Sequence, residues 1–314
     1  MKCTASVLAS AASRALGSIY TKFKQLRGLG FETYSTLYNS GVVPILDYCS
    51  GVWGSNKYSK IESVQNRAIR FYLGVHAFAP DIAITGDVGW LPCGVRRKIE
   101  MIRLWNRLVS MNNDRLTKLA LFEDINSRGK NWSKDIKHIC EIVGFEEFFH
   151  NKLPLPLDEV RRCLFDKFRN EWNATSLNIP KLRMYVKYKH SYHPEPYIYK
   201  IQDRGHCSVL AQFRCGILPL SIETGRYTDV PVDYRLCVFC QSNCVEDEEH
   251  FLFTCTQYND IRLDLWEKVL PDHPEFNDMT ICQKFETLMS ESYVKYTSLF
   301  LYKAFYKRRS ILYR

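Results

Sequence analysis

Apolar residues recur at intervals of three and four along much of this chain, a period that indicates amphipathic helices. Three stretches show the pattern most clearly, and each predicts one helix with a buried face. Over residues 57–75 the apolar positions are Ile61, Val64, Ala68, Tyr72 and Val75. Over residues 94–112 they are Val95, Ile99, Ile102, Trp105 and Leu108. From residue 157 onward they are Leu157, Val160, Leu164, Phe168 and Trp172.

Composition predicts further helices where the periodicity is weaker. Residues 4–27 are rich in Ala, Leu, Lys and Arg, contain no proline and end at the glycines 28 and 30, as a helix would. We also expect helices over residues 31–39, 200–215 and 259–270, and one or two over 279–314. Residues 76–94 contain two prolines and three glycines, which predicts a loop.

Residues 181–189 alternate between basic and apolar or aromatic side chains, and this period of two predicts a β-strand. Cations interleaved with tyrosines can hold phosphates and stack bases. The alternative is an edge strand whose lysines block aggregation. The chain is therefore expected to be mainly α, with a helical region at 1–125. A helical or linker region with the basic strand follows at 126–200. A third region, with short strands and closing helices, occupies 201–314.

Composition and charge bound the class of protein. Apolar residues make up 46% of the 314 residues and charged residues 25%, which is typical of a globular protein. The net charge of +9 is compatible with a polyanionic partner. The twelve cysteines form no dense, regular framework, which favours a reducing compartment, so we expect a nuclear or cytoplasmic protein that is not secreted. No apolar run approaches the length of a membrane span.

Three cysteines and a histidine in the last third have the spacing of metal ligands. Cys237 and Cys240 form a C-x2-C pair, and His250 and Cys255 are separated by about one helical turn. Thiolate and imidazole are the ligands that tetrahedral Zn²⁺ prefers, and four of them leave no open position, so the sequence predicts a structural zinc site. The alternative is a set of unrelated buried thiols, because free cysteine is often a small core residue. Cys244 fits the spacing less well and is expected to be a bystander.

Two groups of basic residues are candidates for contact with RNA or DNA. The first lies on the two predicted helices and comprises Arg67, Arg70, Arg96, Arg103 and Arg107. The second lies on the predicted strand and comprises Lys181, Arg183, Lys187 and Lys189. The alternative for the helical row is a solvated face with local ion pairs, because Glu100 sits between arginines.

Several longer motifs surround these residues. The C-terminal ones run through Phe213-Arg214-Cys215-Gly216, Arg235-Leu236-Cys237, Val245-Glu246-Asp247-Glu248 and Cys255-x-x-Tyr258-x-x-x-Arg262. The N-terminal ones include Pro44-Ile45-Leu46-Asp47-Tyr48, Val64-Gln65-Asn66-Arg67-Ala68 and Gly89-Trp90-Leu91-Pro92. Together they resemble the thumb and C-terminal zinc knuckle of LINE-type (non-LTR) retrotransposon reverse transcriptases. The resemblance implies that the helical region at 1–125 is thumb-like and that 201–314 form a zinc-knuckle domain. In that family the thumb grips the template–primer duplex, so the resemblance also implies a nucleic-acid partner.

The chemistry of a polymerase is missing from this sequence. A reverse transcriptase holds two magnesium ions with carboxylates of an aromatic-x-Asp-Asp turn, and no Asp-Asp pair occurs here. We therefore expect no enzyme activity, unless the chain continues upstream into a palm. The leading hypothesis is a retrotransposon-derived, nucleic-acid-binding fragment that lacks the palm. The alternatives are a zinc-stabilised protein-interaction module and a non-functional remnant.

Overall fold

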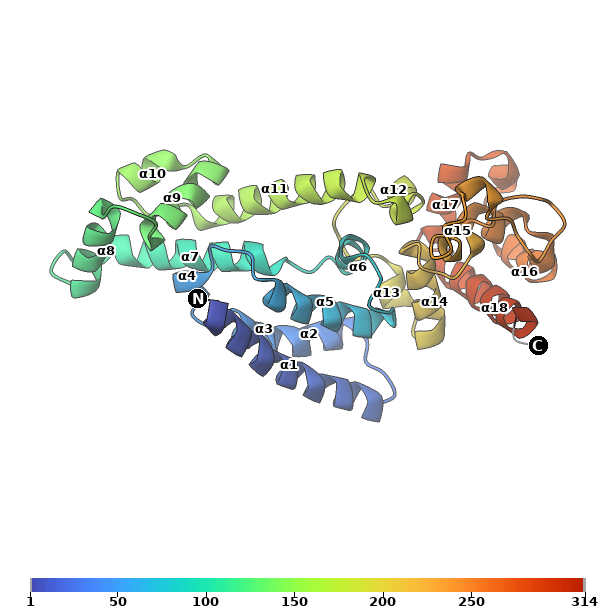
Figure 1. Cartoon of the computed structure of the whole chain (residues 1–314), viewed down its shortest axis with the longest axis horizontal. Coiled ribbons are helices and arrows are strands. Elements are labelled where there is room, and N and C mark those ends of the chain that lie inside the picture. The colour runs from blue at the N-terminus through green and yellow to red at the C-terminus, as the bar shows by residue number, and fades with distance from the viewer. Residues whose placement is uncertain (1, 313–314) are drawn as a thin grey trace. The chain divides into compact units, whose positions relative to one another are not determined.

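The computed structural model describes residues 2–312, and its regular elements are helices joined by loops and short turns (Figure 1). These residues contain no β-strand, and a single isolated antiparallel bridge joins Leu236 to Val245. The prediction of a mainly α fold is therefore confirmed. The short strands expected beside the metal ligands are not found in this part of the chain.

The helices of the first half have the following bounds: α1 (Lys2–Gln25), α2 (Phe31–Gly41), α3 (Val43–Leu46), α4 (Ser50–Trp53), α5 (Ser59–Leu73), α6 (Asp81–Val88), α7 (Cys93–Val109), α8 (Leu116–Asn126), α9 (Trp132–Val143), α10 (Glu146–His150) and α11 (Leu157–Leu177). Those of the second half are η1 (Pro180–Leu182), α12 (Tyr185–Tyr188), α13 (Tyr197–Lys200), α14 (Arg204–Arg214), α15 (Ser221–Thr224), η2 (Val232–Tyr234), η3 (His250–Thr254), η4 (Thr256–Tyr258), α16 (Asn259–Val269), η5 (Pro274–Asp278), α17 (Ile281–Met289) and α18 (Val294–Leu312).

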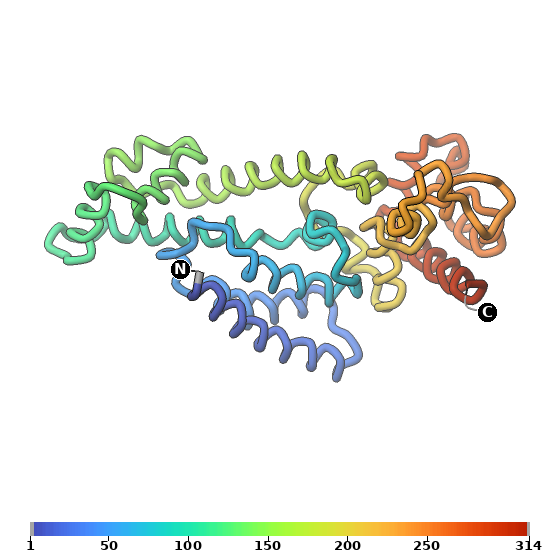
Figure 2. The backbone as a smooth tube through the Cα atoms, viewed as in Figure 1, coloured from blue at the N-terminus to red at the C-terminus, as the bar shows by residue number. Residues whose placement is uncertain are grey.

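The chain divides into two compact units, each assembled from separate stretches, and Figure 2 lets the reader follow the backbone through them. Unit 1 contains the chain up to Lys22, Ser35–Gln65 and Leu91–Glu171. Unit 2 contains Phe23–Tyr34, Asn66–Trp90 and the chain from Trp172 onward. The three consecutive regions expected from the sequence stay a prediction.

The long helices follow the apolar periodicity. All five apolar positions of the 57–75 stretch are buried, and α5 covers most of that stretch. Helix α7 buries Val95, Ile99, Ile102 and Trp105. In both cases the 3.6-residue period places these side chains on one face, and burial of that face stabilises the helix against its neighbours.

Two local predictions are wrong. Residues 76–94 are not a continuous loop, because α6 occupies the middle of the stretch. Pro80 precedes its first residue, and Gly89, at φ +67°, ends it in the left-handed conformation. Proline and glycine here mark the boundaries of a short helix, which is a common use of both residues.

The predicted strand over residues 181–189 is also wrong. The segment folds as the 3₁₀ turn η1 and the single helical turn α12. Leu182, Met184 and Tyr185 are buried, while three of its basic residues pair with acidic residues of unit 2. The alternating pattern was short, and tertiary ion pairs that are invisible in the sequence decided the backbone conformation.

In unit 1 the apolar core forms around α7. Trp105 lies against Phe149 of α10, with ring centroids 5.1 Å apart, and its indole N–H donates to the Leu153 carbonyl at 3.0 Å. The Asn106 side chain forms two hydrogen bonds of 2.7 Å with the backbone of Leu155. These bonds tie the otherwise irregular link before α11 to the centre of α7.

In unit 2 the core contains a buried network of charges. Asp87 of α6 accepts hydrogen bonds from Arg214 of α14 at 2.8 and 2.9 Å, and from the Tyr197 hydroxyl at 2.8 Å. Arg214 also pairs with Glu195 at 2.9 Å, and Glu195 pairs with Lys189 at 2.5 Å. All of these charged groups are buried. The network therefore replaces the water that each charge loses on folding.

The pKa of Asp87 reflects this balance. Burial alone raises the pKa of a carboxyl group, but the Arg214 guanidinium more than offsets it, and the pKa of Asp87 lies below its ordinary value. A depressed carboxyl pKa contributes stability above the pKa of the unfolded state. That contribution is lost as the pH falls through the folded-state pKa.

Replacing Asp87 by Asn should therefore destabilise the protein strongly, because it leaves the buried Arg214 charge underpaired. We expect the free energy of unfolding, measured by urea denaturation at neutral pH, to fall by about 3–5 kcal/mol. The matched control is Asp81→Asn, whose carboxylate pairs with Arg70 but is 58% exposed. Its cost should be under about 1 kcal/mol. Equal, small losses in the two variants would contradict this view of the network.

Candidate metal centre

The four predicted ligands come from two local structures. Cys237 and Cys240 lie on a loop, and the Cys237 N–H donates to the Cys244 carbonyl at 2.9 Å, beside the bridge between Leu236 and Val245. His250 lies at the start of the π-helical turn η3, and Cys255 follows its last residue. A loop and a helical turn thus present two ligands each.

One backbone bond links the second pair of ligands directly. The Cys255 N–H donates to the His250 carbonyl at 2.8 Å, five residues back along the chain. This is the hydrogen bond of a π-turn, which is rare and found frequently at functional sites. It fixes the spacing between the His250 and Cys255 backbones.

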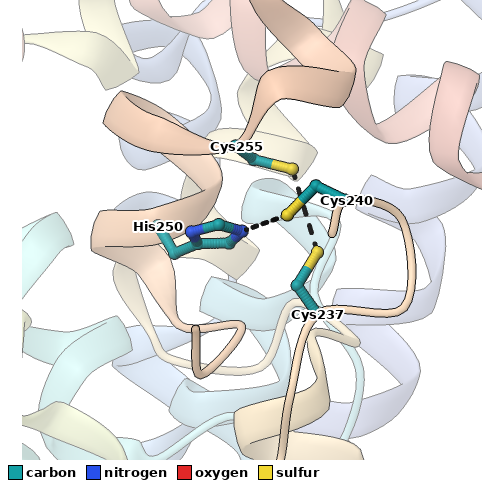
Figure 3. A group of neighbouring side chains, drawn as sticks. All are labelled: Cys237, Cys240, His250 and Cys255. Atoms are coloured by element: carbon teal, nitrogen blue, oxygen red, sulfur yellow. Dashed lines mark hydrogen bonds between the residues drawn. The ribbon is translucent and has the colours of Figure 1, made fainter. Parts of the chain in front are cut away.

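The four side chains converge, as Figure 3 shows. Their ligand atoms all lie within 4.8 Å of one another. The two sulfurs of Cys237 and Cys255 are 3.8 Å apart, and the Cys240 sulfur is 3.3 Å from His250 Nε2. Cys237, His250 and Cys255 are buried, and Cys240 is half-buried. This cluster of three cysteines and one histidine can hold a metal ion.

Two distances between ligand atoms can be compared with those around a tetrahedral zinc ion. Zinc–sulfur bonds of about 2.3 Å and a zinc–nitrogen bond of about 2.0–2.1 Å place neighbouring ligand atoms about 3.8 Å (S to S) and about 3.6 Å (S to N) apart in a tetrahedron. The sulfur–sulfur distance of 3.8 Å agrees, and the sulfur–nitrogen distance of 3.3 Å is slightly short. The sulfur–sulfur distance of 3.8 Å is also far longer than the roughly 2.05 Å of a disulfide bond, so Cys237 and Cys255 are not cross-linked.

The histidine has a fixed orientation. Its Nδ1 lies 2.9 Å from the Thr254 hydroxyl, and its backbone N–H donates to the Asp247 carboxylate at 2.8 Å. Nε2 is therefore the nitrogen that faces the cysteines (Figure 3). A hydrogen bond to the second ring nitrogen is the usual way in which proteins orient a metal-binding histidine.

Hydrogen bonds within the cluster favour the thiolate form at Cys237. The hydrogen bond from the Cys255 thiol lowers the pKa of Cys237 to about 3, and the pKa of Cys255 is raised in turn, since it holds the shared proton. The hydrogen bond with Cys237 raises the pKa of His250. Cys244 is exposed and points its thiol at the Ser242 carbonyl, outside the group of four.

Most of the basic residues predicted to contact nucleic acid are bound internally. In unit 1 the Arg96 guanidinium donates to Asp47 at 2.7 Å and to Gln65 at 2.8 Å. Arg103 is exposed and pairs with Glu100 one turn away, and Arg107 is exposed. The ion pair between Arg103 and Glu100 is the kind of local pair that the alternative interpretation expects. Arg96 has a structural role, because it bonds to Asp47 and Gln65 inside unit 1.

The candidates in unit 2 show the same behaviour. Arg70 pairs with Asp81, Lys181 with Glu223 at 2.5 Å, and Arg183 with Glu248 at 2.6 Å. Lys189 is buried against Glu195. Arg67 is exposed and Lys187 is half-buried. Arg70, Lys181, Arg183 and Lys189 thus form ion pairs within unit 2, with acidic partners that are 6–65 positions away in sequence.

Sequence reasoning missed a different group of cations. The first 80 residues contain nine Lys and Arg and only three acidic residues, and two of these acids, Asp47 and Glu62, are already paired with Arg96 and Arg97. Helix α1 contains no acidic residue. Among residues 3–80 the exposed cations that the sequence analysis did not single out are Arg14, Lys22, Lys24, Arg27, Lys57 and Lys60, and Arg67, which it did single out, is exposed as well. A count of charge by segment would have found them.

Replacing Cys240 by Ser should abolish stoichiometric metal binding and unfold the region around residues 235–265, because three ligands hold the ion far more weakly than four. Cys244→Ser is the matched control and should leave both unchanged. Metal content by mass spectrometry of the native protein and amide hydrogen exchange would measure the two effects. A wild-type protein purified without any metal, or equal loss in both variants, would contradict the assignment.

No helix among residues 2–312 combines the length and the apolar character needed to span a membrane. Comparison of the chain with models of known protein families, with curated proteins and with solved structures gives no match. The assignment of the candidate metal site therefore rests on the geometry of its residues.

Proposed function

We propose that the cluster of Cys237, Cys240, His250 and Cys255 binds one Zn²⁺ in a structural role. The observation that carries this proposal is the convergence of four zinc-type ligand atoms, all within 4.8 Å of one another. Four protein ligands complete the coordination shell, so no position remains for a reactive water. The residues around the site form short turns with little regular structure, and zinc would hold them together. In small finger peptides structural zinc contributes about 10–16 kcal/mol.

The second part of the proposal concerns the partner. We infer that the protein binds RNA or DNA with little sequence preference, through the exposed cations of its first 80 residues. Six of the nine units of net charge lie in this stretch. Helix α1 contributes Arg14, Lys22 and Lys24 without any neighbouring acid on the same helix. Exposed cations suit phosphate contacts, which dominate non-specific affinity.

The resemblance to LINE-type reverse transcriptases supports the same partner, because the similar regions of that family hold template and primer. We propose a retrotransposon-derived fragment that binds nucleic acid and lacks the polymerase palm. Among the alternatives, a protein-interaction module stabilised by zinc would also explain the metal cluster. Such a module would not require a basic helix without acidic residues, such as α1.

Binding to a fluorescent single-stranded RNA or a DNA duplex should weaken steeply with salt. For duplex DNA the slope of log affinity against log salt is about −0.9 per phosphate neutralised. The double variant Lys22→Glu, Lys24→Glu should bind much more weakly and with a shallower slope. Fluorescence anisotropy over a series of salt concentrations measures both.

The control for this experiment is Lys167→Glu, Arg169→Glu on α11. These cations are equally exposed, but acidic residues surround them on the same helix. The control should bind as the wild type does. Salt-independent binding, or no binding at low salt, would favour the protein-interaction module.

The chain alone should extend no primer. Positioning of a duplex does not replace the charge stabilisation that two metal ions supply in phosphoryl transfer, and the carboxylate pair that holds them is absent from this sequence. An assay with purified protein, template RNA, primer, dNTPs and magnesium should show no elongation. Elongation that survives removal of contaminating polymerases would overturn this part of the proposal.

A further inference from the structure

A buried arginine lies beside the metal ligands without an acidic partner. Arg262 of α16 is only 4% exposed. Its guanidinium donates to the carbonyls of Leu252 and Cys255, both at 2.8 Å, and to Phe251 at 3.5 Å. A further bond of 2.5 Å reaches the Asn259 side chain. All of these acceptors are neutral.

The carbonyls that Arg262 binds belong to the structure that carries two ligands. Leu252 and Phe251 lie within the π-turn η3, and Cys255 is itself a ligand. Carbonyls at the end of a helical turn lack intrahelical partners and need donors from elsewhere. Arg262 supplies these donors from a different helix, and so holds the backbone of η3 and of Cys255 in one arrangement.

The charge of Arg262 needs a separate explanation. A buried cation without a counter-charge is costly, and buried arginines are normally paired. Within residues 2–312 no carboxylate forms an ion pair with Arg262. Arg308, the other buried arginine near the ligands, pairs with Glu246, and its guanidinium lies 4.4 Å from the Phe239 ring in the C-x2-C turn. Arg308 is thus already neutralised, and Arg262 is not.

The metal centre itself supplies the missing anion. Three cysteine thiolates, one neutral imidazole and a divalent cation carry a net charge of −1. We infer that Arg262 is the charge-balancing and positioning residue of this centre, and that it stabilises the metal-bound state by offsetting the excess negative charge. This inference rests on the metal site proposed above. It adds a residue that the ligand spacing does not reveal.

The test compares two substitutions of Arg262 in the full chain. Arg262→Met removes the charge and keeps much of the volume, while Arg262→Lys keeps the charge and loses the forked donor. Zinc affinity is measured by competition with a chromophoric chelator. We expect Arg262→Met to lose about 10- to 100-fold in zinc affinity, the range typical when an outer-shell partner of a metal ligand is removed. Arg262→Lys should recover most of that loss.

A matched control separates metal binding from general stability. Arg97 is a buried arginine of unit 1 that pairs with Glu62 at 3.0 Å. Arg97→Met should destabilise unit 1 and leave zinc affinity unchanged. If Arg262→Met does not fold, Arg262→Lys decides the question, because a charge-balancing role predicts affinity near that of the wild type.

Three outcomes would count against the inference. Zinc affinity unchanged in Arg262→Met would overturn it, and so would equal losses in the Met and Lys variants, which would indicate a capping role alone. Losses in Arg97→Met as large as those in Arg262→Met would show a general effect of stability. A wild-type protein that binds no zinc is a different failure, since it would refute the metal site itself.

Discussion

Convergence of four side chains on one point is the constraint on which the C-terminal part of unit 2 depends. Between Tyr227 and Tyr258 the described chain contains only short turns and one isolated bridge. Two of its apolar side chains, Tyr234 and Val238, are more than 70% exposed, and the large buried ones, Phe251 and Tyr258, lie at its C-terminal end. The loop that carries Cys237 and Cys240 therefore buries little apolar area of its own. Small segments of this kind commonly require a metal or disulfides to fold. Binding of zinc to Cys237 and Cys255 would supply that stabilisation directly, because ligands far apart in an unfolded chain are brought to one ion.

Buried charged residues connect the segment that carries the four ligands to the surrounding helices. Glu246 lies close to Cys237 and accepts hydrogen bonds from the Ser221 N–H and hydroxyl at 2.8 and 2.7 Å, and it pairs with Arg308 of α18. Arg262 of α16 donates to the carbonyls of Leu252 in η3 and of Cys255. A buried ion pair is specific in geometry even where its net stabilisation is small. The ligand loop is therefore oriented by side chains of α15, α16 and α18, and these helices are expected to report on metal binding.

Internal ion pairs also change which cations are the better candidates for contact with nucleic acid. A row of arginines and lysines in a sequence suggests a basic face, yet Arg96, Lys181, Arg183 and Lys189 each neutralise an acid of their own unit. A phosphate contact gains less binding free energy from an ion-paired cation than from an exposed one, because the existing pair must be broken first. The residues of α1 and of the 57–67 stretch have few acids near them in sequence. Exposure and the local shortage of acids, rather than the number of cations, make these residues the better candidates.

Sequence alone was sufficient for the features that depend on neighbours along the chain. The 3.6-residue period of α5, α7 and α11 and the spacing of Cys237, Cys240, His250 and Cys255 are local patterns. The structure has the three helices and brings the four ligand atoms together. The strand over residues 181–189 and the loop over 76–94 were wrong, because short patterns leave the backbone open to tertiary contacts. Only the tertiary structure brought Arg214 to Asp87, Arg308 to Glu246 and Arg262 to the carbonyl of Cys255. These pairings join residues 7–127 positions apart. The sequence specifies such groups one by one, but which of them neutralise one another depends on how the helices pack.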